Sequence, residues 1–260
     1  MKILNLVGPG AVDLADRLVA RLDGRVATVE MLPETAAHDT DAAAAFGLST
    51  DGSWIGAGDG RSLDDLIGSL TPAYDHALTI GFEEARLPTV ALGDADPTGD
   101  VVATAPTADA ADVDGILGAI DTLEPHVTLE SLVARAKASP RADRAGAIAT
   151  FTGRVRAKDA EDDDPTTHLE FEKYEGVAAD RMAAIRTELE ARDGVFEVLM
   201  HHRTGVIPDG EDIVFVVVLA GHRTEAFRTV EDGINRLKDE VPIFKKESTT
   251  DEEFWIHEQS

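Results

Sequence analysis

The sequence contains no cysteine. This absence excludes disulfide bonds, thiolate metal sites, a cysteine nucleophile and a persulfide carried on the chain itself. Any sulfur chemistry would therefore need a donor supplied by another molecule. Lysine is also scarce, and Lys2 is the only one before Lys137. A group of lysines elsewhere in the chain therefore requires an explanation.

Long apolar runs are absent too, and the opening segment MKILNLVG lacks the basic, apolar and small-residue layout of a signal peptide. We therefore expect a cytoplasmic protein without a membrane partner. Asp and Glu number 50 against 24 Lys and Arg, and they are spread along the chain, which gives a net charge of -26. Such an acidic surface repels nucleic acid and anionic lipid, and it resembles the surface of halophilic proteins.

Residues 1–124 read as strands that alternate with helices. The apolar run Ile3–Val7 ends in a glycine-proline-glycine turn, and Leu14, Leu18 and Leu22 then recur at helical spacing. Shorter apolar runs predict further strands at Val26–Val29, Trp54–Ala57, Ala77–Ile80, Thr89–Leu92 and Val101–Ala105, and helices at Ser62–Leu70 and Ala110–Ile120. This alternation predicts an α/β domain with a mostly parallel sheet.

The turn after the first strand stands where a phosphate-binding loop would be. The pattern GxxxxGK[ST], started at Gly8, requires Gly, Lys and Ser or Thr where this chain has Asp13, Leu14 and Ala15. A carboxylate replaces the glycine, and the lysine that pairs with phosphate is missing. We therefore expect an ordinary strand-to-helix turn and no binding of a nucleoside triphosphate.

Three segments of this half carry a resemblance. They are the opening strand-turn-helix, RVATVEMLPE at Arg25–Glu34 followed by Asp39–Asp41, and GFEEARLPTVAL at Gly81–Leu92. The half resembles the MobB-like adapter proteins of molybdopterin guanine dinucleotide biosynthesis, which are small GTP-binding proteins of the phosphate-loop class. Because the loop itself is missing, the resemblance implies a degenerate relative that has lost GTP hydrolysis.

Charge composition changes in the middle of the chain. Residues 1–125 hold six basic and 22 acidic residues, whereas residues 126–260 hold 18 and 28, with six of the seven lysines. The segment Asp121–Val127 contains Pro125 and is the expected linker. We therefore predict two domains, at residues 1–124 and 125–260.

The second half again mixes strands and helices. Helices are expected around Leu129–Ala136 and at Val177–Arg192, and strands at Gly146–Arg156, His168–Tyr174, Phe196–Arg203 and Ile213–Ala220. The last strand is apolar throughout, which predicts a central strand covered on both faces. Four consecutive acids at Glu161–Asp164 are more typical of a solvated surface loop than of a metal site, and we predict no metal.

His222 and Arg223 come directly after this apolar strand, and Thr224 is the expected N-cap of the next helix. Lys238 stands at the end of that helix, just before Pro242 interrupts the pattern. The apolar side chains that we expect to face the sheet are Phe227, Val230, Ile234 and Leu237.

Lys245 and Lys246 lie on the extended segment that follows, and they point to opposite sides if it is a strand. Every cation also has a structural interpretation: Lys238 as complement to a helix carboxyl end, Lys246 paired with Glu247, Arg223 paired with Glu225, and His222 as a satisfied histidine. Together, these cations predict an anion pocket in which only one of Lys245 and Lys246 can take part.

Four motifs carry a second resemblance, and they stand in a fixed order. They are GAIATFTGRVR at Gly146–Arg156, LEFEKYEG at Leu169–Gly176, HRTGVIPDGEDIVFVVVLAGHRTEAF at His202–Phe227, and LKDEVPIFKKE at Leu237–Glu247. This half resembles the large, catalytic subunit of molybdopterin synthase, MoaE. The resemblance implies an α+β domain of the α/β-hammerhead fold and a sulfurtransferase that needs no cofactor. Its reaction converts cyclic pyranopterin monophosphate to molybdopterin by installing the two dithiolene sulfurs.

The resemblance also implies partners. In this family the sulfur arrives as a thiocarboxylate on the C-terminal Gly-Gly tail of a small ubiquitin-like subunit, MoaD, and the large subunits form a homodimer. The lack of cysteine agrees with an outside sulfur donor. Because both substrates are anionic, their pocket should be basic even on an acidic protein.

Roles follow from the matching positions. Lys238 matches the lysine beside the inserted tail, where we expect it to transfer protons, and Lys245 matches a second essential lysine. With Arg156, Lys245 would stabilise developing negative charge. His222 and Arg223 match the pair that holds the substrate phosphate. The family more often has arginine at Lys246 and tryptophan at Phe244.

Two other functions compete with this one. A noncatalytic adapter could bind proteins or cofactor of the pathway through a phosphate site, and a plain α/β domain could use its lysines for structure alone. The combination of Lys238, Lys245 and Arg156 favours the synthase, because a passive phosphate site needs fewer cations at defined positions. Co-purification with a small protein that ends in Gly-Gly would separate the three.

Overall fold

The computed structural model describes residues 1–32, 43–158, 160–161, 164–249 and 253–256. The chain divides into two compact units, Met1–Thr128 and Leu129–Ser260, and the predicted boundary after Glu124 lies four residues before this division. In the part of the chain that is described, no helix has both the length and the apolar character needed to cross a membrane. The Asp39–Asp41 motif and two acids of the Glu161–Asp164 run lie outside the described residues.

The first unit is built on a five-stranded sheet in the order β2-β5-β1-β6-β7. Every strand pair in it is parallel. Its elements are β1 (Lys2–Val7), α1 (Ala11–Val19), β2 (Val26–Glu30), α2 (Leu63–Leu70), β5 (His76–Ile80), β6 (Thr89–Leu92), β7 (Val101–Ala105) and α3 (Val113–Thr122). The predicted α/β domain with a parallel sheet is therefore confirmed.

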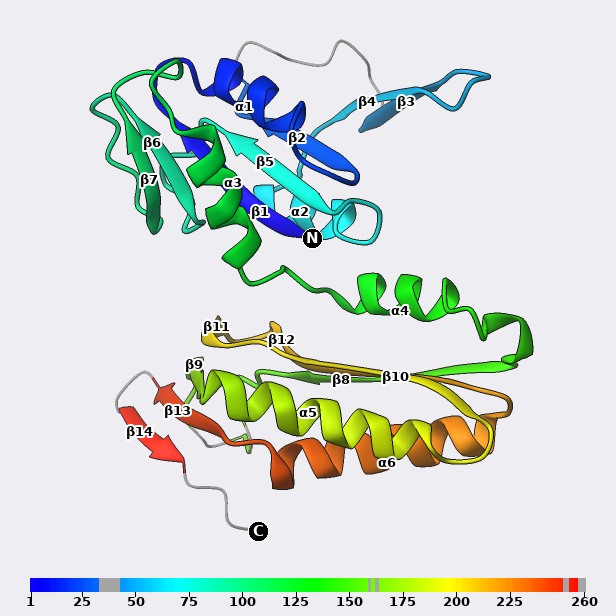
Figure 1. Cartoon of the computed structure of the whole chain (residues 1–260). Helices are drawn as coiled ribbons and strands as arrows, with labels where there is room; N and C mark the ends of the chain where they lie inside the picture. The colour runs from blue at the N-terminus through cyan, green and yellow to red at the C-terminus, as the bar shows by residue number, and fades with distance from the viewer. Residues whose placement is uncertain (33–42, 159, 162–163, 250–252, 257–260) are drawn as a thin grey trace. The chain divides into compact units, whose positions relative to one another are not determined.

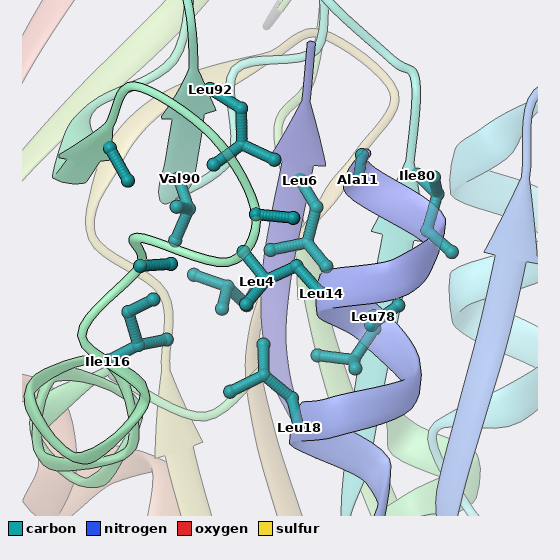
Figure 2. Packing of buried hydrophobic residues seen from close by; sticks show 14 of the residues in the cluster. Leu4, Leu6, Ala11, Leu14, Leu18, Leu78, Ile80, Val90, Leu92 and Ile116 are labelled. Atoms are coloured by element: carbon teal, nitrogen blue, oxygen red, sulfur yellow. The ribbon is translucent and has the colours of Figure 1, made fainter. Parts of the chain in front are cut away.

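The core of this unit lies between the sheet and the helices (Figures 1 and 2). Leu4 and Leu6 of β1 meet Leu14 and Leu18 of α1, and all four side chains are essentially inaccessible to solvent. Leu14 and Leu18 share one face of α1 because their spacing of four residues is close to one helical turn. This spacing is what the sequence pattern predicted.

The turn between β1 and α1 is a tight turn that requires glycine. Gly8 and Gly10 both have positive φ, at 97° and 84°. A Cβ on Gly8 would lie 2.2 Å from the carbonyl oxygen of Leu92, and a Cβ on Gly10 would lie 3.0 Å from the Cβ of Ala108. Arg17 of α1 donates a hydrogen bond to the backbone carbonyl of Ala108. Backbone conformation and close approach therefore explain both glycines.

The segment Trp54–Ala57 does not join the parallel sheet as predicted. It belongs to β4 (Trp54–Gly58), which pairs antiparallel with β3 (Ala44–Leu48) in a separate two-stranded sheet. The β3 strand was not predicted from its alanine-rich sequence. Apolar runs of this length indicate a strand without indicating its partner, so periodicity could not separate a hairpin from a sheet strand.

The second unit contains two antiparallel sheets, in the orders β10-β12-β8 and β11-β9-β13-β14. Its elements are α4 (Leu129–Lys137), a short 3-10 helix (Ala142–Arg144), β8 (Ala147–Arg154), β9 (Thr166–Lys173), α5 (Glu175–Glu190), β10 (Val195–His202), β11 (Gly205–Pro208), β12 (Asp212–Ala220), α6 (Arg223–Glu240), β13 (Ile243–Thr249) and β14 (Glu253–Ile256). Helices and strands are segregated as in an α+β domain, which confirms the predicted class.

The apolar strand β12 occupies the centre of the three-stranded sheet, as predicted. It contacts α6 and α4, which cover opposite faces of the sheet (Figure 1). Val216 and Val218 belong to the core cluster formed with α5 and α6, and the intervening Val217 is 1% exposed. Burial of consecutive residues requires cover on both faces, because side chains alternate along a strand.

The start of α6 differs from the prediction in two respects. The helix begins at Arg223, so His222 is its N-cap in place of Thr224, and the His222 side chain makes no capping hydrogen bond. Phe227 does not face the sheet, because its side chain is 66% exposed. It lies about 100° around the helix from the buried Ala226, at the margin of the stripe that faces the sheet. The other three predicted positions are buried: Val230, Ile234 and Leu237.

Candidate active site

Lys238 lies in the last turn of α6, and its side chain is exposed. Its ammonium complements the helix carboxyl end, which is the structural interpretation. Within the described residues this side chain forms no hydrogen bond or ion pair. In a chain with 50 acidic residues, this lysine therefore has no carboxylate partner among those described.

Lys245 and Lys246 occupy opposite faces of β13, as expected for a strand. Lys245 is paired with Phe171 of β9, and Lys246 is paired with Glu170. Directly paired residues share a face, so Lys245 lies on the face of the buried cluster that includes Leu169 and Phe171. Lys246 lies on the other face, with its Nζ 3.9 Å from a Glu170 carboxylate oxygen.

Glu247 is the acidic neighbour of Lys245, with 3.8 Å between the Lys245 Nζ and the Glu247 Oε2. The other carboxylate oxygen accepts a hydrogen bond from the hydroxyl of Thr166, which is buried. Our expected pairing of Lys246 with Glu247 is therefore wrong, because adjacent residues of a strand point apart while residues two positions apart share a face. That spacing was readable in the sequence and could have identified Glu247.

Arg156 follows β8 and sits beside the same end of the second unit. Its neighbour Val155 is buried in the cluster under Lys245. The next residue, Ala157, accepts a hydrogen bond of 2.8 Å from the backbone N–H of Thr166. Arg154 has a different task, because it forms an ion pair of 3.2 Å with Asp212 at the end of the β8–β12 pair.

His222 and Arg223 lie at the amino end of α6, and both side chains are exposed. Within the described part of the chain neither side chain forms a hydrogen bond or ion pair, and Arg223 is not paired with Glu225. The backbone N–H groups of a helix amino end favour bound anions. A histidine, an arginine and a helix terminus together suit a phosphate group.

One chain does not bring all five residues together. Arg223 and Lys238 are fifteen positions apart on α6, which corresponds to about 22 Å along the helix axis. Figure 1 shows α6 running from the carboxyl end of β12 back to β13. Lys238, Lys245 and Arg156 therefore lie at one end of the unit, and His222 and Arg223 lie at the other.

No group of three or more His, Asp or Glu side chains suited to a metal ion is found among the described residues. A cavity of about 680 Å³ opens in the first unit at the ends of β2 and β5, next to Met31, Phe82 and Arg86. It contains none of the five cations. All five cations belong to the second unit.

Comparison with known proteins identifies the family. The model of the MoaE protein family matches residues 124–240. The chain is 67% identical over 262 residues to the probable molybdopterin synthase of Haloferax volcanii, with 100% of each chain covered. It is 40% identical over 115 residues to the molybdopterin synthase catalytic subunit of Bacillus subtilis, covering 44% of this chain and 72% of that one.

A solved structure of a protein named for another family, MobB, is also similar to part of the chain. The MobB protein homolog from Bacillus stearothermophilus is 20% identical, with a TM-score of 0.38 over 47% of this chain and 100% of that one. The family assignment does not depend on it, because the Haloferax relative matches over its whole length. On that match and the MoaE model, the chain belongs to the MoaE family of molybdopterin synthases.

Proposed function

We propose that the second unit transfers sulfur from the C-terminal thiocarboxylate of a small ubiquitin-like subunit to cyclic pyranopterin monophosphate. The product is the dithiolene of molybdopterin. The observation that carries this proposal is the exposure of Lys238, His222 and Arg223 without a described acidic partner. On a chain of net charge -26, such cations are suited to attract two anionic substrates locally.

Each cation has a separate task in this reaction. The thiocarboxylate sulfur attacks a carbon of the pterin side chain, the carbon–oxygen bond at that carbon breaks as the carbon–sulfur bond forms, and Lys238 donates the proton that the departing oxygen takes up. Two carrier tails react in this way, one for each sulfur of the dithiolene. Lys245 and Arg156 stabilise the negative charge that develops on oxygen. Water then cleaves the acyl–sulfur bond, which leaves the sulfur on the pterin and returns the carrier tail as a carboxylate.

His222 and Arg223 bind the substrate phosphate from a second copy of the chain. Within one copy they stand about 22 Å from Lys238, measured along α6. A two-fold axis pairs the same surface of both copies, so it can bring the amino end of one α6 to the carboxyl end of the other. The homodimer implied by the family resemblance would in this way build two complete sites.

The domain roles follow the same division. We assign molybdopterin synthesis to residues 125–260 and a degenerate adapter role, without GTP hydrolysis, to residues 1–124. A noncatalytic adapter would hold phosphate without making product. The synthase should also co-purify with a small acidic protein that ends in Gly-Gly, and the failure of such a protein to bind would count against the proposal.

The decisive test is molybdopterin formation in a reconstituted assay with the thiocarboxylated small subunit. Lys238→Ala should reduce the rate by about 100-fold or more, the usual loss for a proton-transfer group. Lys246→Ala is the matched control, because Lys246 lies on the other face of β13 and pairs with Glu170. Wild-type product formation by Lys238→Ala would refute the assignment.

A further inference from the structure

One face of the β3–β4 hairpin is a flat apolar surface. Phe46 is paired with Gly56, and Leu48 is paired with Trp54, so the three large side chains share that face. They are 69%, 79% and 59% exposed, in the order Phe46, Leu48 and Trp54. We call these three residues the apolar plate.

Gly56 allows the plate to form. A Cβ on Gly56 would lie 2.9 Å from the ring of Phe46 and 3.2 Å from the ring of Trp54. Both rings therefore extend over the glycine and cover the strand. Any larger residue at this position would push the rings apart, so the sequence of β4 suits a continuous apolar surface.

This surface is unusual for the chain that carries it. Charged residues make up 28% of the sequence, yet Ala44–Leu48 and Trp54–Gly58 contain none, and the acids nearest to them in the sequence are Asp41, Asp51 and Asp59. An isolated two-stranded hairpin is at best marginally stable in water. Exposed apolar surface of this kind marks an interaction site.

We propose that the apolar plate docks against the same plate of a second copy of this chain. A two-fold axis makes an uncharged face complementary to itself. Two acidic chains can meet there without placing carboxylates against each other. A charged partner of another kind would gain no ion pair from the plate, which has neither acid nor base.

The apolar plate is too small to hold two free chains together, so its partner must already be held nearby by another contact. Large apolar and aromatic side chains can bury 150–250 Å² each, so the exposed parts of these three amount to roughly 400 Å² per copy. A stable interface usually needs about 800 Å² per partner. The plate therefore adds to a dimer held elsewhere, where the effective concentration is high, and in this respect it rests on the homodimer of the proposed function.

The absence of cysteine makes a site-specific test possible in the full chain. Ala44→Cys places a thiol on the face of the plate, since Ala44 is two residues from Phe46, and Ala57→Cys places a thiol on the opposite face. A short bismaleimide should give covalent dimers several-fold faster with Ala44→Cys. Adding Phe46→Ser and Trp54→Ser should abolish that difference.

Several results would overturn the proposal. Equal cross-linking of the two thiols would do so, as would cross-linking of Ala44→Cys that survives the serine substitutions. If the Ala44→Cys thiol resists iodoacetamide but forms no covalent dimer, a different surface covers the plate and the proposal is wrong. Circular dichroism would verify that the variants retain the fold.

Light scattering and product formation separate this proposal from the previous one. If Ala44→Cys without the serine substitutions remains a dimer and makes molybdopterin but cross-links no faster than Ala57→Cys, the plate contact fails and the synthase stands. If the wild-type chain is a monomer, the homodimer of the synthase fails. The plate contact fails with it, because roughly 400 Å² per copy cannot hold two free chains together.

Discussion

Two defective chains should restore one another if the active site is shared. One chain carries His222→Ala with Arg223→Ala, and the other carries Lys238→Ala. On α6 the two substituted ends are about 22 Å apart, whereas arginine and lysine side chains reach roughly 6 to 7 Å from their Cα atoms. Because side chains project away from the helix axis, the two ends cannot meet on one phosphate group within a chain.

The expected magnitudes follow from this geometry. Loss of Lys238 removes a proton-transfer group and should cost about 100-fold or more. Loss of His222 and Arg223 removes hydrogen bonds to a charged group, each contributing about 1.5–3 kcal/mol, so substrate binding should weaken by roughly 100-fold or more. In a heterodimer one site carries all the substitutions and the other carries none, so the activity should be about half that of the wild type.

The assay uses heterodimers purified through two different affinity tags, with substrate kept below its KM. Molybdopterin formation is compared with that of each parent homodimer and with a wild-type dimer carrying the same tags. A heterodimer no more active than its parents would refute the shared site. It would mean that all five cations act from one chain, across about 22 Å of α6.

Three further predictions concern single positions. Glu247→Gln should lower kcat about 10-fold, because it releases Lys245 from its acidic neighbour on β13. Glu170→Gln, on the other face of the sheet, should leave kcat unchanged. An equal loss of kcat in both variants would contradict the role assigned to Lys245. Gly8→Ala should lower the free energy of unfolding by at least about 1 kcal/mol, measured by urea denaturation, because the left-handed φ and the β6 carbonyl both oppose a Cβ. Gly68→Ala is the control: its Cβ would meet nothing within 4 Å, so it should stabilise the chain by about 0.5–1 kcal/mol. Burial lowers the pKa of His76 below its usual 6.5. The unfolded chain therefore binds the proton more readily, and the free energy of unfolding should fall as the pH drops through about 6.5. Amide exchange of β5 measures this fall, and the variant His76→Gln should remove it.

Local periodicity predicted those elements whose packing is set by their own sequence. The spacing on α5 predicts one stripe of Ala178, Met182, Ile185 and Leu189; Met182 is partly buried and the other three are fully buried. The alternation of Leu169 and Phe171 predicts a shared face, and both side chains belong to one buried cluster. These patterns work because helices and strands repeat their side-chain directions at fixed intervals. Both units were therefore assigned to the right fold class from sequence.

Short edge strands were not predictable in this way. The strand β11 has four residues, and it forms because Val206 and Ile207 pair with Glu170 and Leu169 of β9. The pairing partner lies about 37 positions away in the chain, so no local pattern contains it. The same reason explains the missed β3 strand, which is alanine-rich and defined only by its pairing with β4.

The site was predicted in composition but not in arrangement. Opposite directions for Lys245 and Lys246 followed from strand alternation, and the register with β9 agrees. Arg223 and Lys238 are near each other in the sequence, but α6 holds them far apart in space. This separation could have been calculated from the predicted helix, which rises about 1.5 Å for each residue.

The length of α6 therefore determines how the proposed sites are built. The helix has 18 residues, and it is a rigid spacer that separates Arg223 from Lys238 by about 22 Å. If each α6 gives its amino end to one site and its carboxyl end to the other, both sites depend on the same spacing. Adding one helical turn to α6 would then move the phosphate-binding pair about 5.4 Å farther from Lys238, and both sites would be disturbed at once. A site formed only at one end of the unit would be disturbed only through the residues of α6 that belong to that end.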